Sequence, residues 1–154
     1  MSGLEQLYQQ IILEHSKQRN GEGITDAAGS PAASNHQYNP TCGDEINLQV
    51  VLSGDRKKID SISWEGDGCS ISMAAASVLS DMAPGMSTQD FQKLVDDFRE
   101  MLRSRGQIEP DEEILGDAAA FAGVSKFVAR VKCAMLSWVA AEEATQAAAQ
   151  EIGA

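Results

Sequence analysis

Three consecutive residues, Cys42-Gly43-Asp44, constrain the fold of this chain more than any other short segment. They follow the turn signal Asn39-Pro40 and place a thiol and a carboxylate on either side of a glycine. The chain has only three cysteines, and the other two, Cys69 and Cys133, lie far along it. We predict that the fold brings Cys42, Asp44, Cys69 and Cys133 to one point, which requires three distant segments to meet.

The local sequence around each cysteine supports this prediction. Cys42 lies in a turn, Cys69 follows a glycine between a strand and a helix, and Cys133 is expected near the start of the last helix. Side chains can converge at the ends of elements, and a helix N-terminus lowers the pKa of a thiol. Three thiolates and one carboxylate suit tetrahedral Zn²⁺, and thiolates also suit iron–sulfur clusters. The alternative is three unrelated buried thiols that bind nothing.

Composition limits the class of protein. A chain of 154 residues with 43% hydrophobic residues fits a single domain over residues 1–154 with its own core. Its net charge of −11 argues against nucleic acid, because phosphate binding needs clustered lysines and arginines, and against an anionic membrane surface. No apolar run reaches the ~20 residues of a membrane span, and the N-terminus lacks a signal-peptide pattern. We expect a cytoplasmic protein whose cysteines stay reduced and bind metal or react.

Hydrophobic periodicity predicts several helices and one hairpin. Ile46, Leu48 and Val50 alternate with polar residues, and a second alternating segment follows the turn at Ser53–Arg56, as in an antiparallel hairpin. We expect strands at 45–52 and 58–65, a short strand at 33–38, and helices at 4–16, 69–82, 87–106 and 133–152. Residues 18–34 and 109–113 are expected to be loops, 117–121 a helical turn, and 126–131 irregular.

Four other residues carry weaker signals. His15, near the end of the first predicted helix, is expected to cap free carbonyl groups or to complement the helix dipole, and metal binding is the less favoured alternative. His36 is expected on the surface, with a role as a spare ligand or partner contact as the alternative. Phe127 and Trp138 are expected in the core or in helix packing, with the other large aromatic residues.

Three ordered motifs resemble those of the IscU/NifU-like superfamily of iron–sulfur assembly proteins. They are Asn39-Pro40-x-Cys42-Gly43-Asp44, Gly68-Cys69-Ser70-Ile71-Ser72, and Arg130-x-x-Cys133-Ala134-x-Leu136-x-Trp138. Two features resemble the SufU branch, a group of zinc-dependent sulfurtransferases. Arg130-Val131-Lys132 stands where the scaffold branch has a histidine before its third cysteine, and residues 85–116 look like the insertion of that branch. Members of the family usually carry proline where this chain has Val128, which we expect to loosen the approach to Cys133.

The resemblance implies an α+β fold, with a small antiparallel sheet packed against four to five helices. It implies Zn²⁺ held by Cys42, Asp44, Cys69 and Cys133, with Cys42 as the catalytic sulfur acceptor that leaves the metal while the others stay. The sulfur would come from a pyridoxal-phosphate cysteine desulfurase of the SufS type and go to a downstream iron–sulfur scaffold. Arg130 is expected to pair with the anionic site.

Two other functions stay open at this point. One is a scaffold that assembles a [2Fe-2S] cluster on the same residues. The other is a zinc-stabilised interaction domain through which no sulfur passes. The missing histidine before Cys133 favours the sulfurtransferase over the scaffold.

Overall fold

The computed structural model describes residues 3–150, which form an antiparallel sheet and a set of helices. The predicted α+β fold is confirmed. In chain order the elements are α1 (Gly3–Gln18), β1 (Ala32–Asn39), β2 (Asp44–Leu52), β3 (Ile59–Asp67), α2 (Ser70–Met82), α3 (Thr88–Arg103), α4 (Glu112–Leu115), the 3₁₀ helix η1 (Gly116–Lys126) and α5 (Val128–Gln150). No helix among these residues is long and apolar enough to cross a membrane.

The sheet has the order β1-β2-β3 and contains the predicted hairpin. Ile46, Leu48 and Val50 point to the buried face, as their alternation with polar residues predicted. β1 is longer than the predicted strand at 33–38 and pairs with β2 up to Asn39 opposite Asp44. That register leaves only residues 40–43 to connect the two strands.

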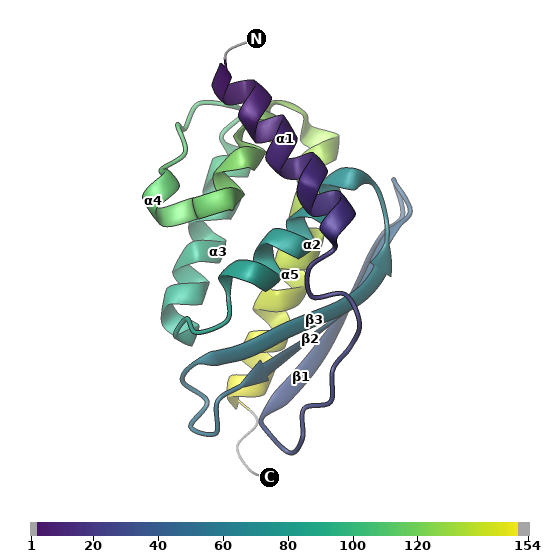
Figure 1. The fold of residues 1–154 in the computed structure, drawn as a ribbon, viewed down its shortest axis with the longest axis vertical. Coiled ribbons are helices and arrows are strands. Elements are labelled where there is room, and N and C mark those ends of the chain that lie inside the picture. The colour runs from purple at the N-terminus through teal and green to yellow at the C-terminus, as the bar shows by residue number, and fades with distance from the viewer. Residues whose placement is uncertain (1–2, 151–154) are drawn as a thin grey trace.

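Helices cover one face of the sheet and continue beyond it. The yellow α5 passes behind the strands in Figure 1 and packs against β1 and β2, while α2 and α3 lie against α5. Phe98 of α3 stacks on Trp138 of α5 with the ring centroids 3.9 Å apart, and it meets Phe121 edge-on at 5.7 Å. These buried aromatic rings join three helices into one core.

The last helix begins at Val128, so the prediction of an irregular segment at 126–131 and of a helix start at Cys133 is wrong. Phe127 has an extended backbone, and its carbonyl accepts hydrogen bonds from the N–H groups of Arg130 and Val131, which opens the helix there. Val128 is thus the first helical residue, a position that favours proline. Cys133 lies in the second turn of α5. The predicted end of this helix at Ile152 lies outside the described residues.

Two more segments differ from the prediction. The acidic loop expected at 109–113 contains the start of α4, because the Asp111 side chain accepts a hydrogen bond from the N–H of Glu113 at 3.0 Å and caps the helix. The helical turn expected at 117–121 extends through η1 to Lys126.

His15 is buried and joins three helices. Its Nδ1 lies 2.8 Å from Ser77 Oγ of α2, and its Nε2 lies 3.0 Å from Asp117 Oδ2 of η1. His15 therefore forms hydrogen bonds with side chains of two other helices instead of capping free carbonyl groups. Both of its ring nitrogens have a partner, which does not favour metal binding. His15 is the one buried residue of the described part of α1, so the apolar residues of this helix are at least partly exposed.

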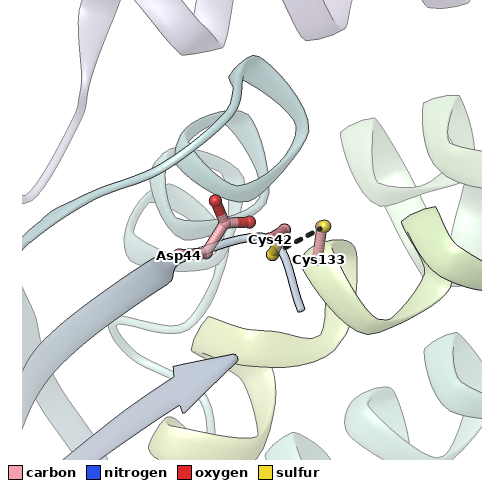
Figure 2. Close-up of side chains that lie close together, drawn as sticks. All are labelled: Cys42, Asp44 and Cys133. Carbon is pink, nitrogen blue, oxygen red and sulfur yellow. Dashed lines mark hydrogen bonds between the residues drawn. The ribbon is translucent and has the colours of Figure 1, made fainter. Parts of the chain in front are cut away.

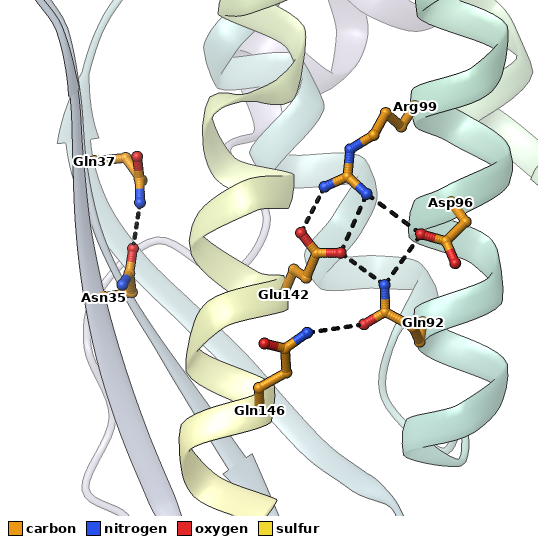
Figure 3. A network of polar contacts seen from close by, with 7 residues as sticks. All are labelled: Asn35, Gln37, Gln92, Asp96, Arg99, Glu142 and Gln146. Carbon is orange, nitrogen blue, oxygen red and sulfur yellow. Dashed lines mark hydrogen bonds and ion pairs between the residues drawn. The ribbon is translucent and has the colours of Figure 1, made fainter.

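A polar network joins α3 to α5 on the surface (Figure 3). Arg99 donates to both carboxylate oxygens of Glu142, at 2.5 and 3.2 Å, and Gln92 donates to one of them at 2.6 Å. Burial alone would raise the pKa of Glu142, but the hydrogen bonds from Arg99 and Gln92 outweigh it and hold that pKa below its ordinary value of 4.5.

Replacing Glu142 with glutamine is expected to lower the free energy of unfolding at neutral pH by about 1–2 kcal/mol, because the charged hydrogen bonds are lost. A carboxylate with a lowered pKa stabilises the fold above its unfolded pKa and loses this effect as the pH falls through its folded pKa. The difference between wild type and Glu142→Gln should therefore shrink below about pH 4.5.

Urea unfolding followed by circular dichroism across this pH range measures the difference in the free energy of unfolding between wild type and Glu142→Gln. The neighbouring Glu143→Gln is the control, because the one hydrogen bond that Glu143 accepts within residues 3–150 comes from the neutral Asn35. An equal loss for both variants would contradict the role given to Arg99.

Candidate metal centre

Cys42 lies at the surface on the connection between β1 and β2. The turn is closed by Asn39, whose carbonyl accepts from the N–H of Gly43 at 2.8 Å and whose side chain accepts from the N–H of Thr41 at 3.0 Å. Gly43 has a φ of +78°, a left-handed conformation that favours glycine. The Asn-Pro and Cys-Gly signals in the sequence thus form one tight turn that carries the exposed Cys42.

Asp44 is the first residue of β2, and only 2% of it is exposed. Its Oδ1 accepts from the N–H of Cys69 at 3.0 Å, and its Oδ2 accepts a hydrogen bond from Ser72 Oγ. A side chain at Gly68 would place its Cβ 2.7 Å from Asp44 Oδ1, so only glycine fits there. The carboxylate is therefore fixed against the start of α2.

Cys133 reaches the same place from α5. Its Sγ lies 3.5 Å from Cys42 Sγ, and Figure 2 shows the two thiols pointing toward each other beside Asp44. One ligand atom from each of Cys42, Asp44 and Cys133 lies within 4.8 Å of the others. The structure thus brings these three predicted residues together from β1–β2 and α5.

Cys69 lies next to this group but outside it. It is the residue before α2, and its Sγ lies 3.6 Å from Asp44 Oδ2 and 3.4 Å from Ser72 Oγ. Its thiol therefore contacts Asp44. It does not meet the mutual 4.8 Å distance that joins Cys42, Asp44 and Cys133.

Two of the separations match those of a tetrahedral zinc site, but the Cys69 thiol would have to move closer to the thiols of Cys42 and Cys133 to complete it. With zinc–sulfur bonds of about 2.3 Å, two sulfur ligands lie about 3.8 Å apart, and a sulfur and a carboxylate oxygen lie about 3.6 Å apart. The Cys42–Cys133 separation is 3.5 Å, and the Cys69–Asp44 separation is 3.6 Å. Two opposite edges of a tetrahedron therefore have the right length, and the three thiols and one carboxylate are a donor set that Zn²⁺ accepts.

The pKa values of two of these groups are shifted in opposite directions. Burial acts to raise the pKa of Asp44, but hydrogen bonds with Ser72, Cys42, Cys69 and Cys133 outweigh it, so this pKa lies below its ordinary value of 3.8. Burial raises the pKa of Cys133 far above its ordinary value, and the contacts with Cys42 and Asp44 add to the rise. A metal ion that binds the Cys133 sulfur would have to displace this proton, which would go to solvent.

Arg130 lies at the rim of the site. Its guanidinium carbon is 5.3 Å from the centre of the Phe127 ring, and among residues 3–150 no ion pair joins it to Asp44. His36 is exposed and pairs with Glu45 at 2.7 Å, which agrees with the expected surface position.

An apolar cavity opens beside the thiols. It has a volume of about 1290 Å³ and lies between α1, η1 and the start of α5, with Cys42, Cys69 and Cys133 in its wall. Phe127 and Val128 also line it and are 56% and 61% exposed, so the prediction that Phe127 belongs to the core is wrong. In the sequence, this surface is indicated only by two adjacent apolar residues, Phe127 and Val128, at the start of a helix. The contact between Ser72 and Asp44 is indicated only by the position of Ser72, three residues after Cys69.

The comparisons with known proteins agree with this geometry. The NifU-like N-terminal domain matches residues 7–134. The chain is 38% identical to a protein of Streptococcus pyogenes serotype M1 named "Iron-sulfur cluster assembly scaffold protein IscU", over 97% of this chain and 89% of that one. It is also 38% identical to the "Zinc-dependent sulfurtransferase SufU" of Bacillus subtilis, over 92% of this chain and 91% of that one.

A solved structure has the same fold. It is described as a putative iron–sulfur cluster assembly scaffold protein for the SUF system from Fervidobacterium islandicum AW-1, with a TM-score of 0.74 and 30% identity. The match covers 88% of this chain and 94% of that chain.

Proposed function

Because this chain belongs to the family of NifU-like N-terminal domains, together with its IscU and SufU relatives, we propose that it is a zinc-dependent sulfurtransferase of the SufU type. It accepts persulfide sulfur from a SufS-type cysteine desulfurase and passes it to a downstream iron–sulfur scaffold in the cytoplasm. One observation carries the proposal: the exposed Cys42 lies on a short turn with its Sγ 3.5 Å from Cys133 and beside Asp44.

The transfer is an exchange between a thiolate and a persulfide. The Cys42 thiolate attacks the outer sulfur of the desulfurase persulfide, a sulfur–sulfur bond forms on Cys42, and the bond to the desulfurase cysteine breaks. The leaving thiolate takes a proton, and nothing is oxidised or reduced overall. The exposure of Cys42 supports this role, because the attacking sulfur must reach a group carried by another protein.

Cys42, Asp44, Cys69 and Cys133 are the residues that would hold zinc, which supplies the positive charge that keeps thiols deprotonated at neutral pH. Cys42 is exposed and lies on a turn, and its Sγ makes long contacts with the Asn39 carbonyl at 4.0 Å and with Cys133 Sγ at 3.5 Å. Asp44 and Cys133 are buried. We assign Arg130, at the rim of the cavity, to balancing the negative charge of this donor set.

The SufU assignment over the IscU one rests on two features. Lys132, which is exposed and lines the cavity, stands directly before Cys133 where the scaffold branch carries histidine. The second feature is the segment 85–116, which we assign as the SufU insertion and which contains α3 and α4.

The cavity is the surface we propose for desulfurase docking. It is apolar, reaches the thiols, and exposes Phe127 and Val128, which gives a partner's persulfide-bearing segment a dry surface beside Cys42. Docking there would also displace water from the site of sulfur exchange.

The test is the turnover of a SufS-type desulfurase with increasing amounts of this protein. Wild type is expected to raise turnover, and Val128→Asp is expected to need about a tenfold higher concentration for half of the effect, because a carboxylate would be buried against an apolar partner. Wild type purified without added metal is expected to contain zinc.

Ile108→Asp is the matched control, because Ile108 is an exposed apolar side chain, at 39%, that does not line the cavity. Equal effects of the two substitutions would contradict the docking surface. If wild type stimulates no SufS-type desulfurase, the proposed function itself is wrong.

A scaffold for a [2Fe-2S] cluster on the same residues is the second candidate. The observation that favours it is the IscU name of the streptococcal relative, which is as similar as the SufU relative. Iron and sulfide in the purified protein, with visible absorbance that survives purification, would support the scaffold. Zinc without visible absorbance supports the sulfurtransferase.

A further inference from the structure

Ser72 lies at the centre of the contacts between two of the proposed metal ligands. It is the third residue of α2, and only 2% of it is exposed. Its hydroxyl donates a hydrogen bond to Asp44 Oδ2 and lies 3.4 Å from Cys69 Sγ. None of the reactions described so far uses this residue.

The Ser72 hydroxyl supplies the second of two hydrogen bonds that the start of α2 donates to the Asp44 carboxylate. The N–H of Cys69 binds Oδ1 at 3.0 Å and Ser72 binds Oδ2, so the first turn of the helix donates to both oxygens. Two donors fix the rotation of the carboxylate plane, and each oxygen keeps a second lone pair for another partner. With Gly68 closing the space on the Oδ1 side, Asp44 has little freedom to turn.

We propose that Ser72 is a positioning residue that orients Asp44 and keeps Cys69 beside it for metal binding. This inference rests on the proposed function, because it assigns how the zinc ligands are held. Without the hydroxyl, Oδ2 of a buried carboxylate would lose this hydrogen bond, and the carboxylate would rotate toward other donors. The Cys69 thiol would lose a neighbour at the same time, so two ligands would be displaced by one change.

Ser70 is a natural comparison. It lies at the exposed first position of α2, close in sequence to Ser72, and it makes no contact with Asp44 among the described hydrogen bonds. Both serines occupy the first turn of the helix, so their replacement by alanine has a similar effect on helix propensity. A difference between the two variants therefore reports the contact with Asp44 and not the helix.

The experiment measures zinc affinity of the purified chain by competition with a chromophoric chelator, with Zn²⁺ as the only ligand. Ser72→Ala is expected to bind zinc about tenfold more weakly than wild type, the lower end of the usual effect of residues that orient metal ligands. Ser70→Ala and the conservative Ser72→Thr, which keeps the hydroxyl, are expected to bind zinc like wild type.

A further variant keeps the test possible if Ser72→Ala does not fold. Ser72→Val has the shape of Ser72→Thr without the hydroxyl, so the Thr–Val comparison isolates the hydrogen bond at constant volume. Equal zinc affinity of these two variants, or wild-type affinity in Ser72→Ala, would overturn the inference. If wild type itself binds no zinc, the proposed function fails as well, whereas normal zinc binding by all Ser72 variants overturns the role of Ser72 alone.

Discussion

Cys42→Ala is expected to reduce the stimulation of a SufS-type desulfurase about a hundredfold or more, because the attacking sulfur is absent. The expected loss is larger than for any other single substitution at the site. We expect neither Cys69 nor Cys133 to replace Cys42, since Cys133 is buried and Cys69, although exposed, has its thiol against Asp44 and Ser72. The measurement is sulfide or alanine production under conditions in which wild type is saturating.

Thr41→Ala is the matched control for this prediction. Thr41 is an exposed neighbour on the same turn, and its backbone N–H to Asn39 survives the change. It also lines the cavity, but alanine adds neither charge nor bulk to the cavity wall. The Thr41→Ala variant should keep the stimulation. If Cys42→Ala stimulates as well as wild type, the chain is an interaction domain through which no sulfur passes.

Trp138→Ala is expected to lower the free energy of unfolding by about 3–5 kcal/mol, which is a large part of the ~5–15 kcal/mol that holds a domain of this kind together. Trp138 is fully buried, stacks on Phe98, and donates from Nε1 to the carbonyl of Ala75 at 3.1 Å. Its loss would leave a cavity between α2, α3 and α5. Because α5 also carries Cys133, the metal centre should loosen with the core.

Urea unfolding of the metal-free protein measures this effect without a contribution from zinc. Trp138→Phe serves as the control, since it keeps an aromatic ring on Phe98 but loses the hydrogen bond to Ala75, and it should cost about 1 kcal/mol from that bond together with a smaller packing loss. An alanine variant as stable as the phenylalanine variant would contradict the central place given to this ring.

The fold was predictable from the sequence where a single period dominates. The alternation of Ile46, Leu48 and Val50 predicted β2, and the hydrophobic spacing from Phe91 to Leu102 predicted α3. The start of α5 was missed because Val128 and Val131 are weak helix formers, and the helix begins instead with a backbone change at Phe127. Helix propensity and hydrophobic spacing do not indicate such a change of backbone conformation.

The sequence predicted four residues at the site, and the structure brings three of them together, Cys42, Asp44 and Cys133, with the Cys69 thiol beside Asp44. Their role in binding metal stays a prediction. The contact of Ser72 with Asp44 joins residues on different elements, so it depends on how α2 meets β2. The exposed Phe127 was missed because large aromatic residues are usually buried, and only the packing around the cavity leaves it at the surface.

Under the proposed function, the register of the sheet has a consequence for the order of events in sulfur transfer. Asn39 pairs with Asp44, so Cys42 is tethered at both ends by a ladder of hydrogen bonds and has only residues 40–43 in which to move. A tether of that length cannot carry sulfur from one docking surface to another. Donor and acceptor must then visit the same spot in turn, and the donor must depart before the acceptor arrives. We expect the kinetics of a substituted-enzyme, or ping-pong, exchange, in which raising the donor concentration too far inhibits the onward step.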